Sequence, residues 1–411
     1  MARIFGIRHR IKQTKEGKAK PTQVAVYSNG NVQAYNLADE TAELDWIKGK
    51  TPIKWREAKQ EEDLDQYPVH HLKVSKTKTK VPAEYDGLQP GDQVVMVLGG
   101  SGDYLAFAIS VRAEELPAAI HRVPPAILKD FRGEDKEDDS KNLIRLWQEK
   151  PQVFQAVASH ERDFIRLRIL YQGLVEARNA RIACGQRIDQ HTIGLTFCRE
   201  DGFFPQGEVK KAAEEAKAND AVYQSLFKEE KRRAKEMEKH LETMAVYTQV
   251  FKPIHGCGPK IAARLLVAIG DINRFPTDAK LKAFCGVHVT PEGKFVRRRS
   301  GQVANWSGEA RQALYLIVDQ FIRRPESDWG NRFVQVKTGL REKHPNVICK
   351  TCSKDGPEVV WSDVCAKKKH KRAYNDGHIH NMAVWHTANK FVRWIYFRWT
   401  NLENQGRQQA A

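Results

Sequence analysis

The chain lacks the features that mark exported or membrane-spanning proteins. Its 411 residues contain no run of eighteen apolar side chains, and the opening MARIFGIRHR has no apolar signal core. Seven cysteines, an odd number scattered through a long basic chain, do not indicate a disulfide framework. These absences predict a soluble, unexported protein that works in a reducing cytoplasm and has no membrane partner.

Acidic side chains are scarce in the C-terminal two-fifths of the chain. Residues 251–411 hold 28 Lys and Arg against 13 Asp and Glu, a net charge of +15, so residues 1–250 supply only +2 of the total of +17. A basic field on one side of a protein is typical of nucleic-acid recognition. A ribosome or membrane surface is the alternative polyanion. The length suffices for two or three units with their own cores.

Residues 1–150 have the pattern of an α/β domain. ARIFGIRHRIK, TQVAVYSN and NVQAYNLA alternate like strands, with Asn29–Gly30 as a turn, and ETAELDWIKG fits a short helix. The polar stretch from KWREAKQEEDLDQ to KVSKTKTK predicts loops. GDQVVMVLGG then predicts a buried central strand, and SGDYLAFAISVRAEEL a helix packed on it. This order is compatible with a ribonuclease-H-like sheet.

Residues 151–250 predict a helical hairpin. Apolar side chains recur at three- and four-residue steps among charges over residues 159–188, as in one arm of a coiled coil. Residues 208–250 are rich in Ala, Lys and Glu and carry a second apolar stripe. We expect two long helices that pack antiparallel.

Residues 251–345 begin with a turn that opens a helix. Gly256 and Gly258, followed by Pro259, predict a tight turn, and the apolar spacing from Lys260 predicts a helix that ends near Gly270. A glycine turn at a helix start presents free N–H groups to an anion, and the basic side chains beside it favour a nucleic-acid phosphate. A purely structural helical hairpin is the alternative.

The segment that follows, residues 284–318, is the richest in arginine. Its basic side chains lie between turn residues and a new helix, where they outnumber what solubility requires. The candidate RNA-binding residues of this part of the chain are Lys260, Arg264, Lys294, Arg297, Arg298, Arg299 and Arg311.

Residues 346–411 combine a metal-ligand pattern with an aromatic helix. Cys349 and Cys352 form a CxxC pair, and Cys365 with His370 completes a plausible tetrahedral zinc site. His378 or His380 is the alternative fourth ligand, and three free cysteines in a loop are the alternative to any metal. Residues 381–399 predict a helix with an aromatic face, which favours a core or dimer contact over base stacking.

The stretch IHGCGPKIAARLLVAIGDINRFPTDAKLKAFCGV, residues 254–287, resembles the C-terminal domain of the DEDD transposases related to the pilin-gene invertase. That domain is in turn similar to the guide-RNA-binding Nop fold of box C/D ribonucleoproteins and of the Tas proteins encoded beside tandem interspaced guide RNAs. The resemblance implies a ribonuclease-H-like catalytic domain in which four carboxylates hold two divalent metal ions. It also implies a prokaryotic or phage origin.

The chain departs from that family at the positions that match its catalytic residues. The first-strand aspartate position reads Arg8, after Gly6 and Ile7, and the glutamate position after the central strand reads Gly99. The final aspartate pair falls on Lys136 and Asp139, unless Asp135 substitutes through a one-residue shift. The nucleophilic serine aligns with Glu292, and Ser300 and Ser307 are imperfect alternatives. One or two carboxylates beside an arginine would not hold two cations.

Together these patterns predict an α/β + α chain in four parts. They are a catalytically degenerate ribonuclease-H-like domain (1–150), a coiled-coil hairpin (151–250), a helical Nop-like domain (251–345) and a zinc loop with a C-terminal helix (346–411). The resemblance implies a protein that binds a small guide RNA and recognises double-stranded DNA without cleaving it, and we also expect a homodimer. A divergent RNA-guided DEDD recombinase and an RNA-independent DNA-binding protein are the alternatives.

Overall fold

The computed structural model divides the chain into two compact units. It describes residues 3–11, 19–75, 78–133, 137–157, 159–200, 209–291, 293–297, 301, 304–354 and 356–410. The first unit is Met1–Ile165 and the second is Arg166–Ala411. Each is described by itself below. The four-part division drawn from the sequence stays a prediction.

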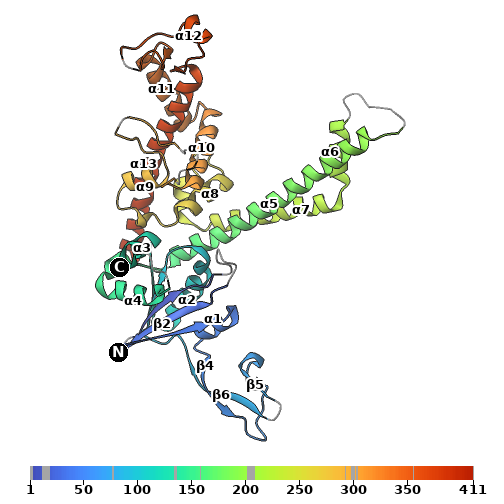
Figure 1. Cartoon of the computed structure of the whole chain (residues 1–411), viewed down its shortest axis with the longest axis vertical. Helices are drawn as coiled ribbons and strands as arrows, with labels where there is room; N and C mark the ends of the chain where they lie inside the picture. The colour runs from blue at the N-terminus through green and yellow to red at the C-terminus, as the bar shows by residue number, and fades with distance from the viewer. Residues whose placement is uncertain are drawn as a thin grey trace. The chain divides into compact units, whose positions relative to one another are not determined.

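The first unit is built on a mixed six-stranded sheet (Figure 1). Its strand order is β3-β2-β1-β7-β8-β9, in which β1, β7 and β8 are parallel neighbours and every other pairing is antiparallel. The strands are β1 (Ile4–Arg8), β2 (Thr22–Ser28), β3 (Asn31–Leu37), β7 (Gln93–Val97), β8 (Ala119–Val123) and β9 (Gln155–Ala156). The meander and the central strand expected from the sequence are β1 to β3 and β7.

Helices cover both faces of this sheet. The helices are α1 (Glu40–Ile47), α2 (Asp103–Glu115), α3 (Pro125–Arg132) and α4 (Asp139–Glu149). Phe5 and Ile7 pack with Trp46 of α1 and Ile109 of α2 in one core. Side chains alternate along a strand, so Gly6 and Arg8 face the other side, where α4 packs on β1. Because β1 and β7 are parallel neighbours, their carboxyl ends lie side by side at the same end of the sheet. Helix α4 contacts both strands.

A small second sheet interrupts the first unit between α1 and β7. It has the order β4-β6-β5, with β4 (Thr51–Glu57), β5 (Lys73–Val74) and β6 (Thr79–Asp86), and we call it the insert sheet. The sequence predicted loops in this segment, and this was wrong where β4, β5 and β6 form. Many charged residues hide the alternation of apolar and polar side chains that indicates a strand. Backbone pairing of β4 and β5 with β6 forms the sheet nevertheless.

The arm of the second unit differs from the predicted hairpin in its second half. The first helix, α5 (Ser159–Phe197), runs past the predicted end at residue 188. The second is divided into α6 (Val209–Asn219) and α7 (Ala221–Leu241), because Asp220 adopts an extended conformation and accepts a hydrogen bond from the Tyr223 N–H as the cap of α7. Arg181 of α5 forms an ion pair with Glu230 of α7, which links the two sides of the hairpin.

The remainder of the second unit is helical around one core. Its helices are α8 (Pro259–Ile269), α9 (Asp278–Phe284), α10 (Gly308–Ile322), α11 (Asp328–Lys343), α12 (Asp363–Lys367) and α13 (Asp376–Ala410), with a short β10 (Ile348–Cys349) paired to β11 (Arg372–Ala373). The predicted aromatic face of the last helix lies inside this core, since Phe391 and Trp399 are fully buried. Phe391 packs edge-on against Trp329 of α11, with ring centroids 4.8 Å apart.

Among the residues that the structure describes, no helix combines the length and the apolarity that a bilayer crossing requires.

Candidate functional site

Of the two glycines in the turn before α8, Gly256 has the backbone that requires glycine, whereas Gly258 is extended with a φ of −66°. Gly256 has a φ of +92°, and a Cβ at this position would lie 2.9 Å from the Cβ of Gln320, so a side chain fits neither the backbone nor the space. Lys260 in the first turn of α8 is exposed. Arg264, one turn later, is half-buried and donates a hydrogen bond to the Gln312 side chain. Lys260 is therefore open to a ligand, whereas Arg264 is partly engaged with α10.

Arg311 of α10 is held between two indole rings. Its guanidinium carbon lies 4.7 Å from the ring centre of Trp306 and 4.2 Å from that of Trp385. The same group donates a hydrogen bond to the Gly286 carbonyl, with Nη1 and O 2.7 Å apart. Arg311 of α10 therefore contacts α13 and the loop after α9. One of its guanidinium N–H groups is already hydrogen-bonded within the protein.

The arginine segment between α9 and α10 is described only in part. Lys294 and Arg297 are exposed, and the Thr290 N–H donates to the Lys294 carbonyl at 2.8 Å to close a turn. Arg298 and Arg299 lie outside the described residues. Of the seven predicted RNA-binding residues, the structure describes five, and three of those five are exposed: Lys260, Lys294 and Arg297.

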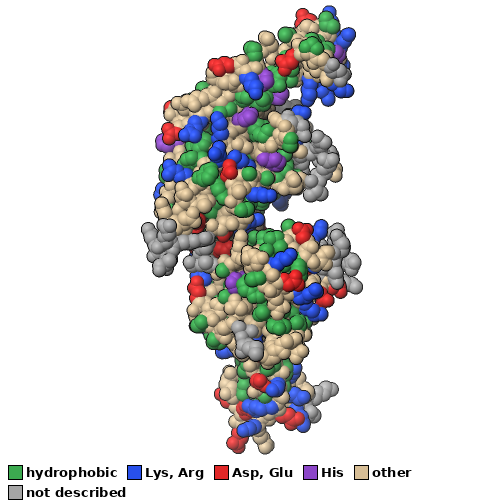
Figure 2. Space-filling model, turned by 90° about the vertical axis from the view of Figure 1, so that its left-hand side faces the viewer, with side chains coloured by type: hydrophobic (Ala, Val, Ile, Leu, Met, Phe, Trp, Pro, Cys, Tyr) green, Lys and Arg blue, Asp and Glu red, His purple; other side chains and the backbone are tan. Residues whose placement is uncertain are grey.

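Positive charges gather around Arg297. Burial lowers the pKa of Arg311, and the neighbouring charge of Arg297 lowers it further. Burial likewise lowers the pKa of His378, with further lowering by the charges of Arg297 and Lys350. Burial is the larger cause of both shifts, and the positive charge of Arg297 adds to each, which favours an anion on this surface. Figure 2 shows Lys and Arg side chains over the part of the chain that carries α12.

A basic groove lies between α11 and α13. It encloses about 870 Å³, and its lining includes Arg332, His386 and Lys390 together with Asp328. Burial lowers the pKa of His386, and the charges of Lys390 and Lys343 lower it further. Two cations, Arg332 and Lys390, and one carboxylate, Asp328, therefore line this groove.

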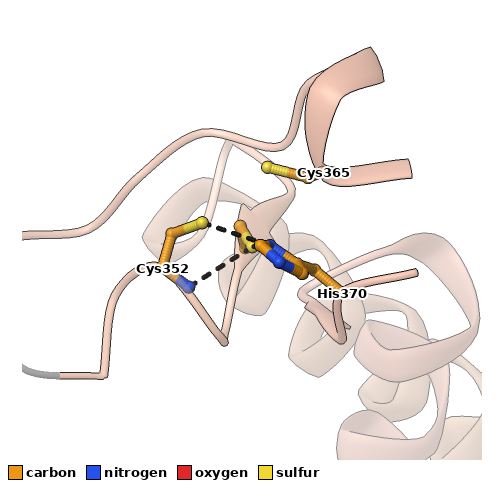
Figure 3. A group of neighbouring side chains, drawn as sticks. Cys352, Cys365 and His370 are labelled. Atoms are coloured by element: carbon orange, nitrogen blue, oxygen red, sulfur yellow. Dashed lines mark hydrogen bonds between the residues drawn. The ribbon is translucent and has the colours of Figure 1, made fainter. Parts of the chain in front are cut away.

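The structure brings Cys349, Cys352, Cys365 and His370 together. Their ligand atoms all lie within 4.8 Å of one another. The pairing of β10 with β11 brings Cys349 near His370, while Cys365 lies on α12 across the site (Figure 3). Nδ1 of His370 lies 3.5 Å from Sγ of Cys349 and 3.3 Å from Sγ of Cys352. In a tetrahedral zinc site, sulfur and nitrogen ligands are separated by about 3.5 Å.

The chemistry of these thiols also fits a metal. A hydrogen bond from the Ser362 hydroxyl lowers the pKa of Cys365 to about 6, whereas its neighbour Cys349 raises the pKa of Cys352 to about 11. One thiolate is thus available near neutral pH, and a bound cation would ionise the others. The backbone N–H of Cys352 points at Sγ of Cys349, 3.5 Å away.

The alternative fourth ligands are engaged elsewhere. His378 accepts a hydrogen bond from the Tyr374 N–H at 2.9 Å and stacks on that tyrosine ring. His380 packs against Phe333, with ring centroids 5.5 Å apart. His370 is therefore the histidine of this cluster.

One comparison with known proteins bears on this half of the chain. Residues 248–335 match the model of the transposase IS116/IS110/IS902 family. The matched segment runs from just before α8 into α11, and so contains the glycine turn, the arginine segment and Arg311. A search of the curated proteins found no match to the chain. The resemblance to transposases is thus supported over this segment.

Arg8 and Gly99, which the sequence resemblance predicted at the first two carboxylate positions, lie at the ends of neighbouring strands. Arg8 closes β1, and its Nε is buried without a hydrogen-bond partner among the described residues. Gly99 follows the adjacent parallel strand β7, with a φ of +89°. A cation and a glycine therefore lie side by side where these two parallel strands end.

Asp139, the second member of the predicted aspartate pair, lies at the start of α4. A Cβ on Gly6 would lie 1.9 Å from the Ser140 carbonyl oxygen, so the first turn of α4 rests directly on β1. Asp139 in that turn pairs with Arg132, with Oδ1 and Nε 2.9 Å apart. Asp135, Lys136, Glu292 and Ser300 lie outside the described residues. Ser307, the remaining serine alternative, accepts a hydrogen bond from the Ala310 N–H as the cap of α10.

Sequence reasoning missed two polar clusters in the first unit. His9, just after β1, lies 2.8 Å from the Ser101 hydroxyl and 3.4 Å from the Glu43 carboxylate. Asp45 contacts both His70 and His71. The adjacent histidines were the only signal of the second cluster, and nothing in the sequence linked them to an aspartate 25 residues earlier.

Proposed function

We propose that this chain is a transposase-related protein that binds a small guide RNA and recognises double-stranded DNA without cutting it. The observation that carries the proposal is the exposure of Lys260, Lys294 and Arg297 within the segment that resembles transposases. Backbone phosphates are the natural counterions of such a surface. Base pairing by the guide would then read the sequence of the target.

The Cys/His cluster is proposed to hold one structural zinc ion. Three thiolates and one imidazole form a closed donor set, which is typical of structural rather than catalytic zinc. Cys349, Cys352, Cys365 and His370 would hold the ion and stabilise the loop that presents Lys350 near His378. The metal would thus help to shape part of the basic surface.

We also propose that the chain does not cleave DNA, because of the residues at the strand ends in the first unit. The strand order and directions of β1, β2, β3, β7 and β8 fit a ribonuclease-H-like sheet, in which two metal ions would lie at the ends of β1 and β7. Arg8 would repel these ions, and Gly99 offers no ligand. Paired with Arg132, Asp139 is also partly neutralised.

The RNA that copurifies with the full-length chain tests this proposal. We expect a discrete small RNA in the purified wild-type protein and its loss from an Arg297→Glu variant. Lys228→Glu is the matched control, since it makes the same charge change on α7 of the arm. Protein that is free of RNA but still shifts duplex DNA would support the RNA-independent alternative. Homodimer formation stays a prediction, which sedimentation analysis tests.

A recombinase is the second candidate, and the matched transposase segment favours it. It would use Asp139 with neighbouring acids and a serine. Incubation with a supercoiled plasmid, the copurified RNA and Mg²⁺ or Mn²⁺ separates the candidates. Nicked or joined strands that disappear in an Asp139→Ala variant would establish the enzyme.

A further inference from the structure

Two adjacent histidines converge on one aspartate in the first unit. Nε2 of His70 and Nε2 of His71 each lie 2.7 Å from the same oxygen, Oδ2 of Asp45. The aspartate belongs to α1, whereas both histidines belong to the short helix Val69–His71 within the insert-sheet segment. The ligand atoms of the three residues all lie within 4.8 Å of one another. Two separate elements thus bring two imidazoles and a carboxylate to one point.

This cluster is closed on one side and open on the other. The side chains of His71 and Asp45 are 3% and 12% exposed, whereas that of His70 is 47% exposed. His71 is also wedged between His70 and Tyr85, with ring centroids 4.3 Å and 5.6 Å away. An ion held here would be fixed by two buried ligands and would keep contact with solvent.

Hydrogen bonding to Asp45 does not satisfy His71. Its Nδ1 is buried and has no hydrogen-bond partner among the described residues. Since an imidazole carries one proton when neutral, an ion bound at Nε2 would place that proton on Nδ1 and so fix the tautomer of His71.

The carboxylate is ready to act as a ligand. One negative oxygen and two imidazole nitrogens form the donor set that suits divalent first-row transition metals.

We propose that Asp45, His70 and His71 form a second metal site for a divalent transition-metal ion. Neighbouring ligands of an octahedral ion with bonds of about 2.1 Å lie about 3.0 Å apart, whereas a tetrahedral ion requires about 3.4 Å. The two separations of 2.7 Å need to open by only a few tenths of an ångström for the octahedral case. The three residues would occupy one face of the ion, and the remaining positions would face solvent beside His70.

Metal counting on the full-length chain tests this site without reference to nucleic acid. Reduced, zinc-loaded protein is dialysed to equilibrium against Co²⁺, and bound zinc and cobalt are counted together by elemental analysis. We expect about two ions per wild-type chain and about one in His70→Ala or Asp45→Asn. His191→Gln, on an exposed position of α5, is the matched control and should keep both ions.

Equal metal content in wild type and a folded His70→Ala variant would overturn the site. Circular dichroism checks the fold, which His70→Ala should preserve because nearly half of this side chain is exposed. The cobalt spectrum of the wild-type chain gives a second readout that does not depend on a variant. Cobalt at the Cys/His cluster gives a thiolate charge-transfer band, whereas cobalt at Asp45, His70 and His71 gives none. If all of the bound cobalt is accounted for by the thiolate band, the second site does not exist.

Discussion

Replacing Arg311 separates a structural role from a role in RNA binding. The guanidinium lies between Trp306 and Trp385 and donates a hydrogen bond to the Gly286 carbonyl. Arg311→Ala removes two cation–π contacts of about 0.5–1 kcal/mol each and a charged hydrogen bond of about 1.5–3 kcal/mol. Because such terms are not additive, we expect the free energy of unfolding of the second unit to fall by about 3 kcal/mol.

Urea unfolding followed by tryptophan fluorescence measures this loss, since both indoles that hold Arg311 report on it. Arg311→Lys keeps the charge but loses the planar stack, so it should recover only part of the stability. Arg297→Ala is the control, because Arg297 is exposed, and it should change stability by less than about 0.5 kcal/mol. A stable Arg311→Ala protein that has lost its RNA would refute the structural role and make Arg311 a ligand contact.

Three further predictions follow from single sites. Cys352→Ser should lower the zinc content by one ion per chain, as measured by elemental analysis, and should unfold the loop that the ion closes. The reason is that zinc supplies much of the folding free energy of so small a unit. Cys198→Ser, at an exposed cysteine, is the control and should leave the metal content unchanged. Arg297→Glu should weaken RNA binding and reduce its salt dependence in filter binding; an unchanged salt slope would argue against a phosphate contact. Gly6→Ala should destabilise the first unit by about 3 kcal/mol in thermal unfolding, since its methyl would meet the Ser140 carbonyl; near-wild-type stability would show that α4 can move away.

Periodicity predicted the elements whose burial follows one regular face. The helix expected from Lys260 to near Gly270 is α8, and its buried side chains include Leu265 and Ile269. α11 was missed because only Trp329, Gly330 and Phe333 are buried along a helix that is otherwise polar. Its start depends on Ser327, which caps the helix by accepting a hydrogen bond from the Gly330 N–H. A cap followed by so short an apolar stripe gives a weak sequence signal.

The candidate site was predictable where spacing alone decides geometry. A CxxC turn followed by Cys365 and His370 constrains the four ligands, and the structure brings them together. Arg311 shows the limit of the method, because counting charges cannot reveal that a guanidinium is stacked between indoles. The same holds for Asp45 and His71, whose contact depends on how α1 meets the insert-sheet segment.

The most direct test of the central claim is a binding and cleavage assay with the chain's own RNA. The copurified RNA is sequenced, a DNA duplex that matches it is synthesised, and both are combined with the protein in Mg²⁺ or Mn²⁺. The account predicts a shifted duplex whose strands stay intact, because Arg8 and Gly99 stand where metal-binding carboxylates would be needed. Strands that are cut or joined by the wild-type chain, but not by Asp139→Ala, would contradict it.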